Sequence, residues 1–392
     1  MYTTTTPCNH YGFCQTAAVP HNKVPDIDID AVDVVYVYYK SRVWGLYCAW
    51  KRLLPSIKPY YAIKCNPDSV ILDALSKYGS CFDAASPAEI DAALKRVSPN
   101  KIIYANPCKT PKDISYASSK GVSLTVFDNI LEHNKVRQYA PDMKMLFRIY
   151  ASDTSAQCVL SNKYGAVSEE WEDILKAADR DFVKGISFHI GSGANDPDAF
   201  SHAIRAARTV FDTSKRLGYN FSVLDIGGGF THKNIEKMSA CINRELQDFV
   251  QAYPSVQVIA EPGRYFAETV ADLYTKVIGH RTRGVEQHYW INDSLYGSFN
   301  CILYDHAKPT ASVVAQTPAP PAPPAPLQES QTQLPCIIWG STCDGFDKIL
   351  ETSLPRVQVG DWLCWNNMGA YTLAGASSFN GIPFDKATKV YI

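Results

Sequence analysis

The sequence predicts an α/β protein that consists of an eight-stranded (β/α) barrel and a second, β-rich domain. Between residue 59 and about residue 260, short apolar runs typical of strands alternate with helical segments eight times, which is the pattern of a closed parallel barrel. After residue 265 the helical segments give way to short β-type runs bounded by Gly, Asn and Asp. An open, doubly wound sheet fits less well, because no Gly-x-Gly-x-x-Gly motif follows the first strand.

The expected domain limits follow from this change of pattern. The barrel is predicted over residues 40–270, and the β domain over residues 1–39 together with 271–392. Residues 1–25 are expected to be disordered. Residues 310–335 contain a proline tract and are expected to form a stiff, Pro-rich loop.

Composition limits the classes of function. The 392 residues are 46% hydrophobic and 20% charged, with a formal net charge of −1 and a pI near 6.7. This balance gives no electrostatic basis for binding nucleic acid or an anionic membrane. The twelve cysteines never form Cys-x-x-Cys, so free thiols are favoured over a zinc site or a disulfide framework. Without a signal-peptide pattern or a long apolar run, the sequence predicts a soluble, cytoplasmic protein.

The elements carry local signals of their own. Residues 34–39 are predicted as a strand, and residues 41–54 as a helix with apolar positions at i, i+3, i+4 and i+7. Ser86-Pro87-Ala88-Glu89 is a capping box that starts a further helix. The eight barrel strands are expected at 59–64, 80–85, 101–105, 122–127, 144–149, 184–189, 222–226 and 256–260. Strands of the second domain are expected at 289–291, 299–304, 337–339 and 362–365.

Polar residues gather where the barrel strands end, which is where barrels of this class build their active sites. The strand ends carry Lys64, Asp83, Asn106, Asp128, Arg148, His189, the triplet Gly227-Gly228-Gly229 and Glu261. The last two loops of such barrels commonly bind phosphate, and here they hold the glycine triplet and Glu261-Pro262-Gly263-Arg264. Glycine lets backbone N–H groups approach an anion, and Arg264 can add a bidentate contact.

A lysine, a phosphate cradle and a carboxylate in one barrel mouth are what pyridoxal 5'-phosphate requires. The lysine bonds to the aldehyde of the cofactor, and a carboxylate keeps its pyridine nitrogen protonated. Lys64 and Glu261 are the candidates for these two functions. His189 could stack on the ring, although a core histidine bonded to backbone is as good an interpretation of its position.

The motifs resemble those of eukaryotic ornithine decarboxylases, from about residue 34 to residue 392. They are Tyr61-Ala62-Ile63-Lys64-Cys65-Asn66, Phe82-Asp83-Ala84-Ala85-Ser86, Phe188-His189-Ile190-Gly191-Ser192-Gly193, Leu224-Asp225-Ile226-Gly227-Gly228-Gly229-Phe230, Glu261-Pro262-Gly263-Arg264-Tyr265, Tyr296 to His306, Trp339 to Asp347, Met368-Gly369-Ala370-Tyr371-Thr372 and Phe379-Asn380-Gly381. The resemblance implies a barrel of the alanine-racemase type. It also implies a head-to-tail homodimer with two shared active sites.

The resemblance further implies a role for each matching residue. Lys64 would bond to the cofactor, Glu261 would pair with the pyridine nitrogen, and His189 would stack on the ring. Around the phosphate would lie Ser192, Gly228, Gly229, Arg264 and Tyr371, with Asp83 and Arg148 as supporting polar groups. Cys343 of the partner subunit would return a proton to Cα after carbon dioxide leaves. The distal end of a basic amino acid would be bound by Asp305, by Tyr304 and by Asp344 of the partner subunit.

The resemblance leaves the substrate open. The expected reaction is decarboxylation of L-ornithine to putrescine, because His306 after Asp305 is similar to the ornithine type; lysine or another diamino acid is the alternative. Ser341 replaces a usual proline, and Trp365-Asn366 replace a usual Phe-Glu. A catalytically inactive homologue, similar to antizyme inhibitor, is a rival of another class, and an antizyme-like protein is a possible regulator. No metal is expected.

Overall fold

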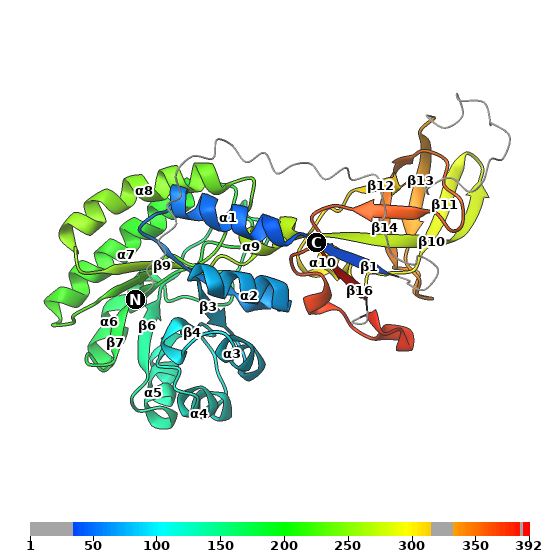
Figure 1. Cartoon of the computed structure of the whole chain (residues 1–392). Coiled ribbons are helices and arrows are strands. Elements are labelled where there is room, and N and C mark those ends of the chain that lie inside the picture. The colour runs from blue at the N-terminus through cyan, green and yellow to red at the C-terminus, as the bar shows by residue number, and fades with distance from the viewer. Residues whose placement is uncertain (1–33, 315–331, 385–386) are drawn as a thin grey trace, which may run out of the picture.

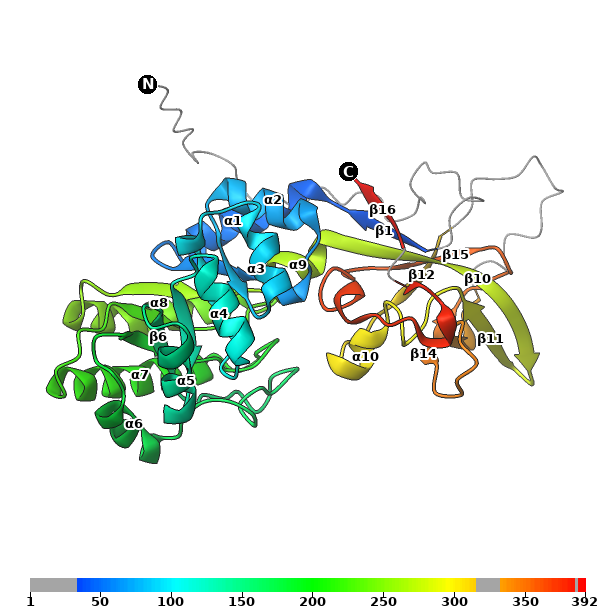
Figure 2. The same cartoon turned by 90° about the horizontal axis from the view of Figure 1, so that it is seen from below.

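The computed structural model describes residues 34–314, 332–384 and 387–392, and these form two lobes (Figures 1 and 2). The first lobe is a closed barrel in which eight parallel strands pair in sequence order and the last strand pairs with the first. Its strands are β2 (Lys58–Ala62), β3 (Cys81–Ala84), β4 (Ile102–Tyr104), β5 (Leu124–Phe127), β6 (Lys144–Arg148), β7 (Val183–Ser187), β8 (Val223–Asp225) and β9 (Gln257–Ala260).

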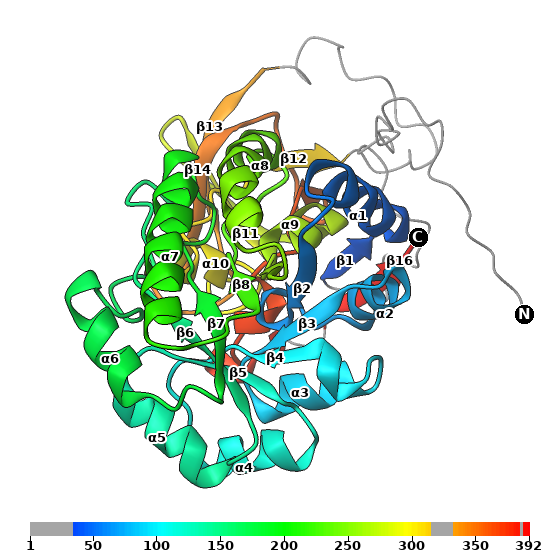
Figure 3. The ribbon, with the colours of Figure 1, turned by 90° about the vertical axis from the view of Figure 1, so that its left-hand side faces the viewer.

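Helices surround the barrel strands, as Figure 3 shows looking into the barrel. They are α1 (Lys40–Leu53), α2 (Ser69–Tyr78), α3 (Pro87–Leu94), α4 (Pro111–Ser119), α5 (Ile130–Tyr139), α6 (Trp171–Ala177), α7 (Asp198–Arg216), α8 (Ile235–Ala252) and α9 (Arg264–Ala267). The predicted N-cap is confirmed, since Ser86 Oγ accepts from the Glu89 N–H at 3.3 Å and Pro87 begins the helix. The predicted capping box is incomplete, because the Glu89 carboxylate accepts from the Ala85 N–H at 2.7 Å and not from the N–H of Ser86. The predicted (β/α) alternation is therefore confirmed.

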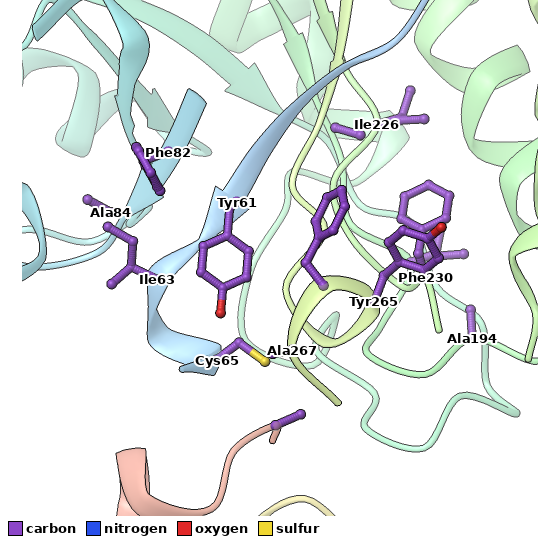
Figure 4. Packing of buried hydrophobic residues seen from close by; sticks show 14 of the residues in the cluster. Tyr61, Ile63, Cys65, Phe82, Ala84, Ala194, Ile226, Phe230, Tyr265 and Ala267 are labelled. Atoms are coloured by element: carbon purple, nitrogen blue, oxygen red, sulfur yellow. The ribbon is translucent and has the colours of Figure 1, made fainter. Parts of the chain in front are cut away.

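Side-chain alternation along the strands separates two packed layers. One set points into the barrel and forms its own cluster: Tyr60, Cys81, Ile103, Val126, Leu146 and Ile259. The other set packs outward against the helices; Tyr61, for example, lies beside Phe82 with ring centroids 6.5 Å apart. Figure 4 shows this outer layer continuing past Tyr265 and Ala267 of α9 toward Cys65. Packing on both sides fixes the strand ends that carry the polar residues.

The second lobe is a mixed sheet in which β12–β15–β10–β11–β13–β14 are hydrogen-bonded in that order, while β1 pairs with both β10 and β16. Its elements are β1 (Val35–Tyr38), β10 (Ala271–Arg283), β11 (Glu286–Ile291), α10 (Asn300–Tyr304), β12 (Ala311–Val314), β13 (Leu334–Trp339), β14 (Lys348–Leu354), β15 (Trp362–Trp365) and β16 (Thr388–Tyr391). The long strand β10 leaves the barrel and forms the spine of this sheet (Figure 2).

Two sequence-based expectations for this lobe need correction. Residues 299–304 form the short helix α10 and not a strand. The side chain of Asn300 is buried and donates to the carbonyls of Gly297 and Thr372, which fixes a turn where an apolar run alone cannot distinguish strand from helix. The predicted Pro-rich loop at 310–335 includes part of two strands, β12 and β13. Its proline tract and the predicted disordered residues 1–25 lie outside the described residues.

Short 3₁₀ turns complete the described structure. They are η1 (Ile63–Cys65), η2 (Pro99–Lys101), η3 (Ser168–Glu170), η4 (Glu268–Val270), η6 (Leu373–Gly375) and η7 (Phe379–Gly381). Strand β2 ends at Ala62, so Lys64 lies in the turn that follows the strand and not in the strand itself. Within the described ranges, no helix combines the length and the apolarity that crossing a bilayer requires.

Candidate active site

Lys64 lies at the mouth of the barrel, bonded to a buried carboxylate. Its Nζ is 2.5 Å from Oδ2 of Asp83, and 42% of the Lys64 side chain stays accessible whereas the Asp83 side chain is fully buried. Burial lowers the pKa of Lys64, but the carboxylates of Asp83 and Glu261 outweigh this and raise it above the ordinary value. The amine is therefore held as a cation. It can act as a nucleophile only after it loses a proton, which requires that the ion pair with Asp83 be broken.

Glu261 and Asp225 form a second acidic pair, directly after β9 and at the end of β8. Burial raises the pKa of Glu261 well above its ordinary value, and the neighbouring carboxylates of Asp225 and Asp83 raise it further. Burial also raises the pKa of Asp225 to about 7, although the Gly227 N–H that bonds its Oδ1 at 2.9 Å acts against this. Oε1 of Glu261 has no hydrogen-bond partner among the described residues. This atom is available to pair with a basic nitrogen of a ligand.

His189 follows β7 and is uncharged. Its Nδ1 accepts a hydrogen bond from the Gly191 N–H at 3.0 Å, so the neutral ring carries its proton on Nε2. Burial lowers the pKa of His189 well below its ordinary value, and the charges of Arg148 and Lys64 lower it further. A Cβ at Gly228 would lie 2.8 Å from Nε2 of His189. Glycine at 228 therefore leaves room beside the imidazole that a side chain would fill.

Arg264 begins α9 and is almost fully buried. Its Nη2 donates to Ser192 Oγ at 3.1 Å and to Asp305 Oδ1 at 2.5 Å, and its guanidinium lies 5.2 Å from the ring centroid of Tyr371. Its Nε has no partner among the described residues. The group thus keeps a free N–H donor in a region where three predicted phosphate-binding side chains meet.

The backbone of Tyr371 is strained, which is unusual for a bulky residue. It has φ of +55°, in the left-handed region. The Tyr371 N–H donates to the carbonyl of Cys65 at 2.9 Å, which connects this segment to the turn that carries Lys64. A Cβ at Gly263 would lie 3.0 Å from Cβ of Cys65, so a larger residue there would crowd the same turn.

Asp305, predicted to bind the substrate, is buried and already paired. Besides Arg264, its carboxylate accepts from Nε2 of Gln157 at 3.2 Å and contacts Sγ of Cys158 at 3.5 Å. Burial raises the pKa of Asp305, while Arg264 acts against this. Its neighbour Tyr304 is 76% exposed.

Cys343 and Asp344 lie elsewhere, on the loop between β13 and β14 of the second sheet. Cys343 is exposed, and its N–H donates to Oδ1 of Asn380 at 3.2 Å. The Phe346 N–H and the Tyr296 hydroxyl donate to Asp344 and hold the pKa of this carboxyl below its ordinary value. In the described part of the chain, no hydrogen bond or ion pair joins these two residues to the barrel mouth.

The structure therefore brings together most of the predicted site and leaves part of it apart. One group surrounds the barrel mouth, and Arg148 belongs to it through its charge on His189 and Glu261. The residues that the structure leaves apart from the mouth are Tyr304, Cys343 and Asp344. The site residues predicted from the sequence do not include Asp225, Gln157 or Tyr296. Asp225 carried a visible signal, since it precedes the glycine triplet at a strand end, and Tyr296 begins the motif Tyr296 to His306. Gln157 lies in a loop without any motif of its own.

The mouth has the chemistry that a pyridoxal phosphate site requires. An amine, an unpartnered acid and a glycine-lined recess beside an uncharged imidazole converge there, and Arg264 keeps a donor free. Among the described residues, no group of three or more His, Cys, Asp and Glu side chains is arranged to hold a metal ion. All cysteines in the described ranges carry free thiols.

Comparison with known proteins identifies the family. Residues 41–268 match the family model described as the pyridoxal-dependent decarboxylase, pyridoxal binding domain. The chloroplastic ornithine decarboxylase of Nicotiana glauca is 44% identical over 361 residues, with 88% of this chain and 81% of the relative covered. The chain belongs to the ornithine decarboxylase family of pyridoxal-dependent decarboxylases. Ornithine decarboxylase of Rattus norvegicus is 40% identical over 376 residues, covering 90% and 79%.

A solved structure shows that the likeness extends through both lobes. The arginine decarboxylase of Paramecium bursaria Chlorella virus superposes with a TM-score of 0.85 and 35% identity, covering 92% of this chain and 96% of that one. The predicted family, the alanine-racemase-like barrel and the cofactor, pyridoxal 5'-phosphate, are thereby confirmed. This decarboxylase uses that cofactor.

Proposed function

We propose that this enzyme decarboxylates L-ornithine to putrescine and carbon dioxide, as a step of polyamine biosynthesis. The observation that carries the proposal is the mouth in which Lys64, Glu261 and Arg264 converge with the buried carboxylate of Asp305. Ornithine has a cationic distal end, which a carboxylate in a partly desolvated pocket can select. The decarboxylase relatives from Nicotiana and Rattus act on ornithine, as their names state.

When bound, the cofactor supplies an electron sink for the pair left on Cα as carbon dioxide departs. Lys64 holds it covalently, and Asp83 keeps the lysine amine placed at the mouth. Glu261, the unpartnered acid, pairs with the pyridine nitrogen. His189 would lie against the ring as an uncharged group, so it would not compete for the carboxylates. The position and charge state of each side chain support these roles.

A second set of residues would hold the phosphate of the cofactor. Arg264 supplies charge and a free N–H, and Ser192 supplies a hydroxyl beside it. Gly228 and Gly229 allow the backbone to approach, since Gly229 has φ of +108°. Tyr371 closes the cradle over the guanidinium. Arg148 and Asp83 support the charge balance of the site.

The chain forms a homodimer with shared sites in this proposal. Cys343 is exposed and Asp344 is half-buried, and their neighbour Phe346 is 85% exposed, a large apolar group with no cover in one copy. Cys343 of the partner subunit returns a proton to Cα, and Asp344 of the partner subunit joins Asp305 and Tyr304 around the distal ammonium. An antizyme-like protein remains a candidate regulator. We place the enzyme in the cytoplasm, which a fluorescent fusion can test, since the plant relative is named chloroplastic.

Turnover of three substrates tests this function. The cofactor-loaded enzyme is supplied with ornithine, lysine and arginine, and ornithine is expected to have the highest kcat/KM by about tenfold or more, because one extra methylene is discriminated by that order. Preference for lysine or arginine would overturn the substrate assignment. Absence of turnover with all three would favour an inactive homologue.

Covalent attachment is tested separately. The loaded protein is expected to be yellow, and borohydride should bleach it and fix the cofactor to one peptide. Mass spectrometry is expected to locate the adduct on Lys64. An adduct on another lysine would contradict the assigned role, independently of the substrate.

A further inference from the structure

A cavity of about 550 Å³ lies between the barrel and the second sheet, next to the site but separate from its lysine. One wall comes from the turn before α8, with His232 and Lys233. A second wall comes from the segment after α10, with His306 and Lys308, and a third from the segment after β15. Neither Lys64 nor the glycine triplet lines it. This volume is within the range of small-molecule sites.

The acidic groups of this cavity already have partners within the protein. Oε2 of Glu268 lies 2.7 Å from Nδ1 of His232, and Oε1 of Glu268 lies 3.7 Å from Nη1 of Arg264. Oδ1 of Asp305 lies 2.5 Å from Nη2 of the same arginine. Both carboxylates therefore contact basic side chains of the chain itself.

The two lysines of the cavity have no such partner among the described residues. Lys233 and Lys308 are exposed, and in the described ranges neither has a carboxylate within 4.0 Å. They belong to different lobes, and both line the cavity. Two unpaired cations that line one concave site create a positive potential inside it.

The third wall adds neutral donors. Asn366 and Asn367 line the cavity, and in the described structure no protein acceptor binds the amide nitrogen of either side chain. Carboxamide N–H groups bind oxyanions without adding charge. The lining thus combines two ammonium groups with free amide donors.

We propose that this cavity binds a small dianion of the phosphate class, held between Lys233 and Lys308 with Asn366 and Asn367 as further donors. Lysine binds phosphate as a point charge. A phosphate dianion carries two negative charges and can pair with both lysines at once, whereas a single carboxylate carries only one. The cavity adjoins the cofactor phosphate site, since Arg264 lines it, but the four proposed donors are not among the predicted ligands of the cofactor phosphate. The inference does not depend on which amino acid the enzyme decarboxylates.

Titration of the cofactor-loaded enzyme with inorganic phosphate, in a phosphate-free buffer, tests this inference. Loading fills the cofactor site, so calorimetry is expected to show one additional saturable site per chain. Lys233→Gln with Lys308→Gln is expected to weaken phosphate binding roughly tenfold or more, since charge-assisted hydrogen bonds are lost. Lys308→Arg keeps the charge and is expected to keep the binding.

The matched control removes the same charge elsewhere. Lys237→Gln with Lys215→Gln changes exposed lysines of α8 and α7 that do not line the cavity, and it is expected to leave phosphate affinity within about twofold. Equal weakening in both double variants would show general attraction and overturn the proposal. Failure of the loaded wild-type enzyme to bind phosphate below about 10 mM would also overturn it.

Discussion

The barrel mouth and the β13–β14 loop carry the two halves of the proposed site, and they differ in burial and in bonding. In the mouth, Asp83 and Arg264 are almost fully buried and bonded to other site residues. On the loop, Cys343 is exposed and Phe346 is 85% exposed. The residues of the mouth bond to one another within one chain, whereas the loop exposes a thiol and an apolar ring that could contact another chain.

This difference separates two kinds of dependence. Cofactor attachment depends on residues of the mouth and should survive changes in the loop. Substrate recognition and the choice of product depend on both halves, because the loop supplies Asp344 for the substrate and Cys343 for the return of the proton. Five predictions test this division.

Removal of the lysine amine should have the largest effect. Lys64→Ala is expected to lower kcat by about three orders of magnitude or more, because no other side chain at the mouth can bond to the cofactor. Turnover and the absorbance of the loaded protein measure the effect. Lys58→Ala, at the opposite end of β2, is the control and should behave as wild type.

Glu261→Gln tests the acid of the mouth with little change of shape. Loss of a preorganised electrostatic partner is expected to lower kcat about a hundredfold, while the cofactor stays attached to Lys64. Steady-state kinetics with absorbance spectra distinguish this outcome from simple loss of cofactor. Unchanged kcat would show that the buried acid has no part in the reaction.

Asp344→Asn tests the loop half. The change is expected to cost about 2–5 kcal/mol of ornithine recognition, mainly as an unpaired charge on the substrate, with cofactor absorbance unchanged. Measurement of kcat/KM gives the cost. Asp212→Asn, on an exposed face of α7, is the matched control; a variant at 344 that behaves like this control would remove the loop from the site.

Mixing two damaged subunits tests whether the halves come from different chains. Cys343→Ala is expected to bind the cofactor but to lose clean amine formation. When it is mixed in equal amounts with Lys64→Ala, half of the dimers are hybrids with one intact site, so putrescine formation should return to about a quarter of the wild-type rate. No recovery after verified subunit exchange would mean that each site is built by one chain.

Asp225 gives the smallest effect and concerns pH. Burial raises its pKa to about 7 and the charge of Asp83 adds to this, while hydrogen bonds with Gly227 and Glu261 and the charge of Arg148 act against it. The folded chain binds this proton more tightly than the unfolded chain, so this group lowers the free energy of unfolding as pH rises from about 4 to about 7. In Asp225→Asn this contribution is absent. Urea unfolding of the cofactor-free protein at pH 5 and pH 8 should show a smaller decrease for the variant.

The sequence predicted the barrel well because its strands and capped helices follow local rules. The N-cap at Ser86 is an example, and so is the alternation that places Tyr60 and Tyr61 on opposite faces. It predicted the second sheet less well. The predicted strand at 299–304 was wrong because Asn300 makes a long-range hydrogen bond to the carbonyl of Thr372, which cannot be predicted from a local pattern. Long-range contacts of this kind are decided by tertiary structure.

The site divides in the same way. Lys64 and Glu261 could be predicted because strand ends of a barrel converge, whatever the rest of the chain does. The pairing of Asp305 with Arg264 could not, because it depends on how the second sheet approaches the barrel. The free surface around Cys343 is likewise a property of the folded lobe. Geometry between lobes is absent from local sequence.

Strand β1 has a consequence for how the chain is made. Val35 pairs with Tyr274 of β10 and with Thr388 of β16, so this short strand near residue 35 pairs with two segments that come much later in the chain. On the ribosome, the barrel strands can all emerge and close while β1 still lacks both neighbours. The second lobe is completed only when residues near 390 are released, and contacts this distant in sequence form slowly. Nascent chains should therefore pass through a stage with a closed barrel and an unpaired, apolar first strand.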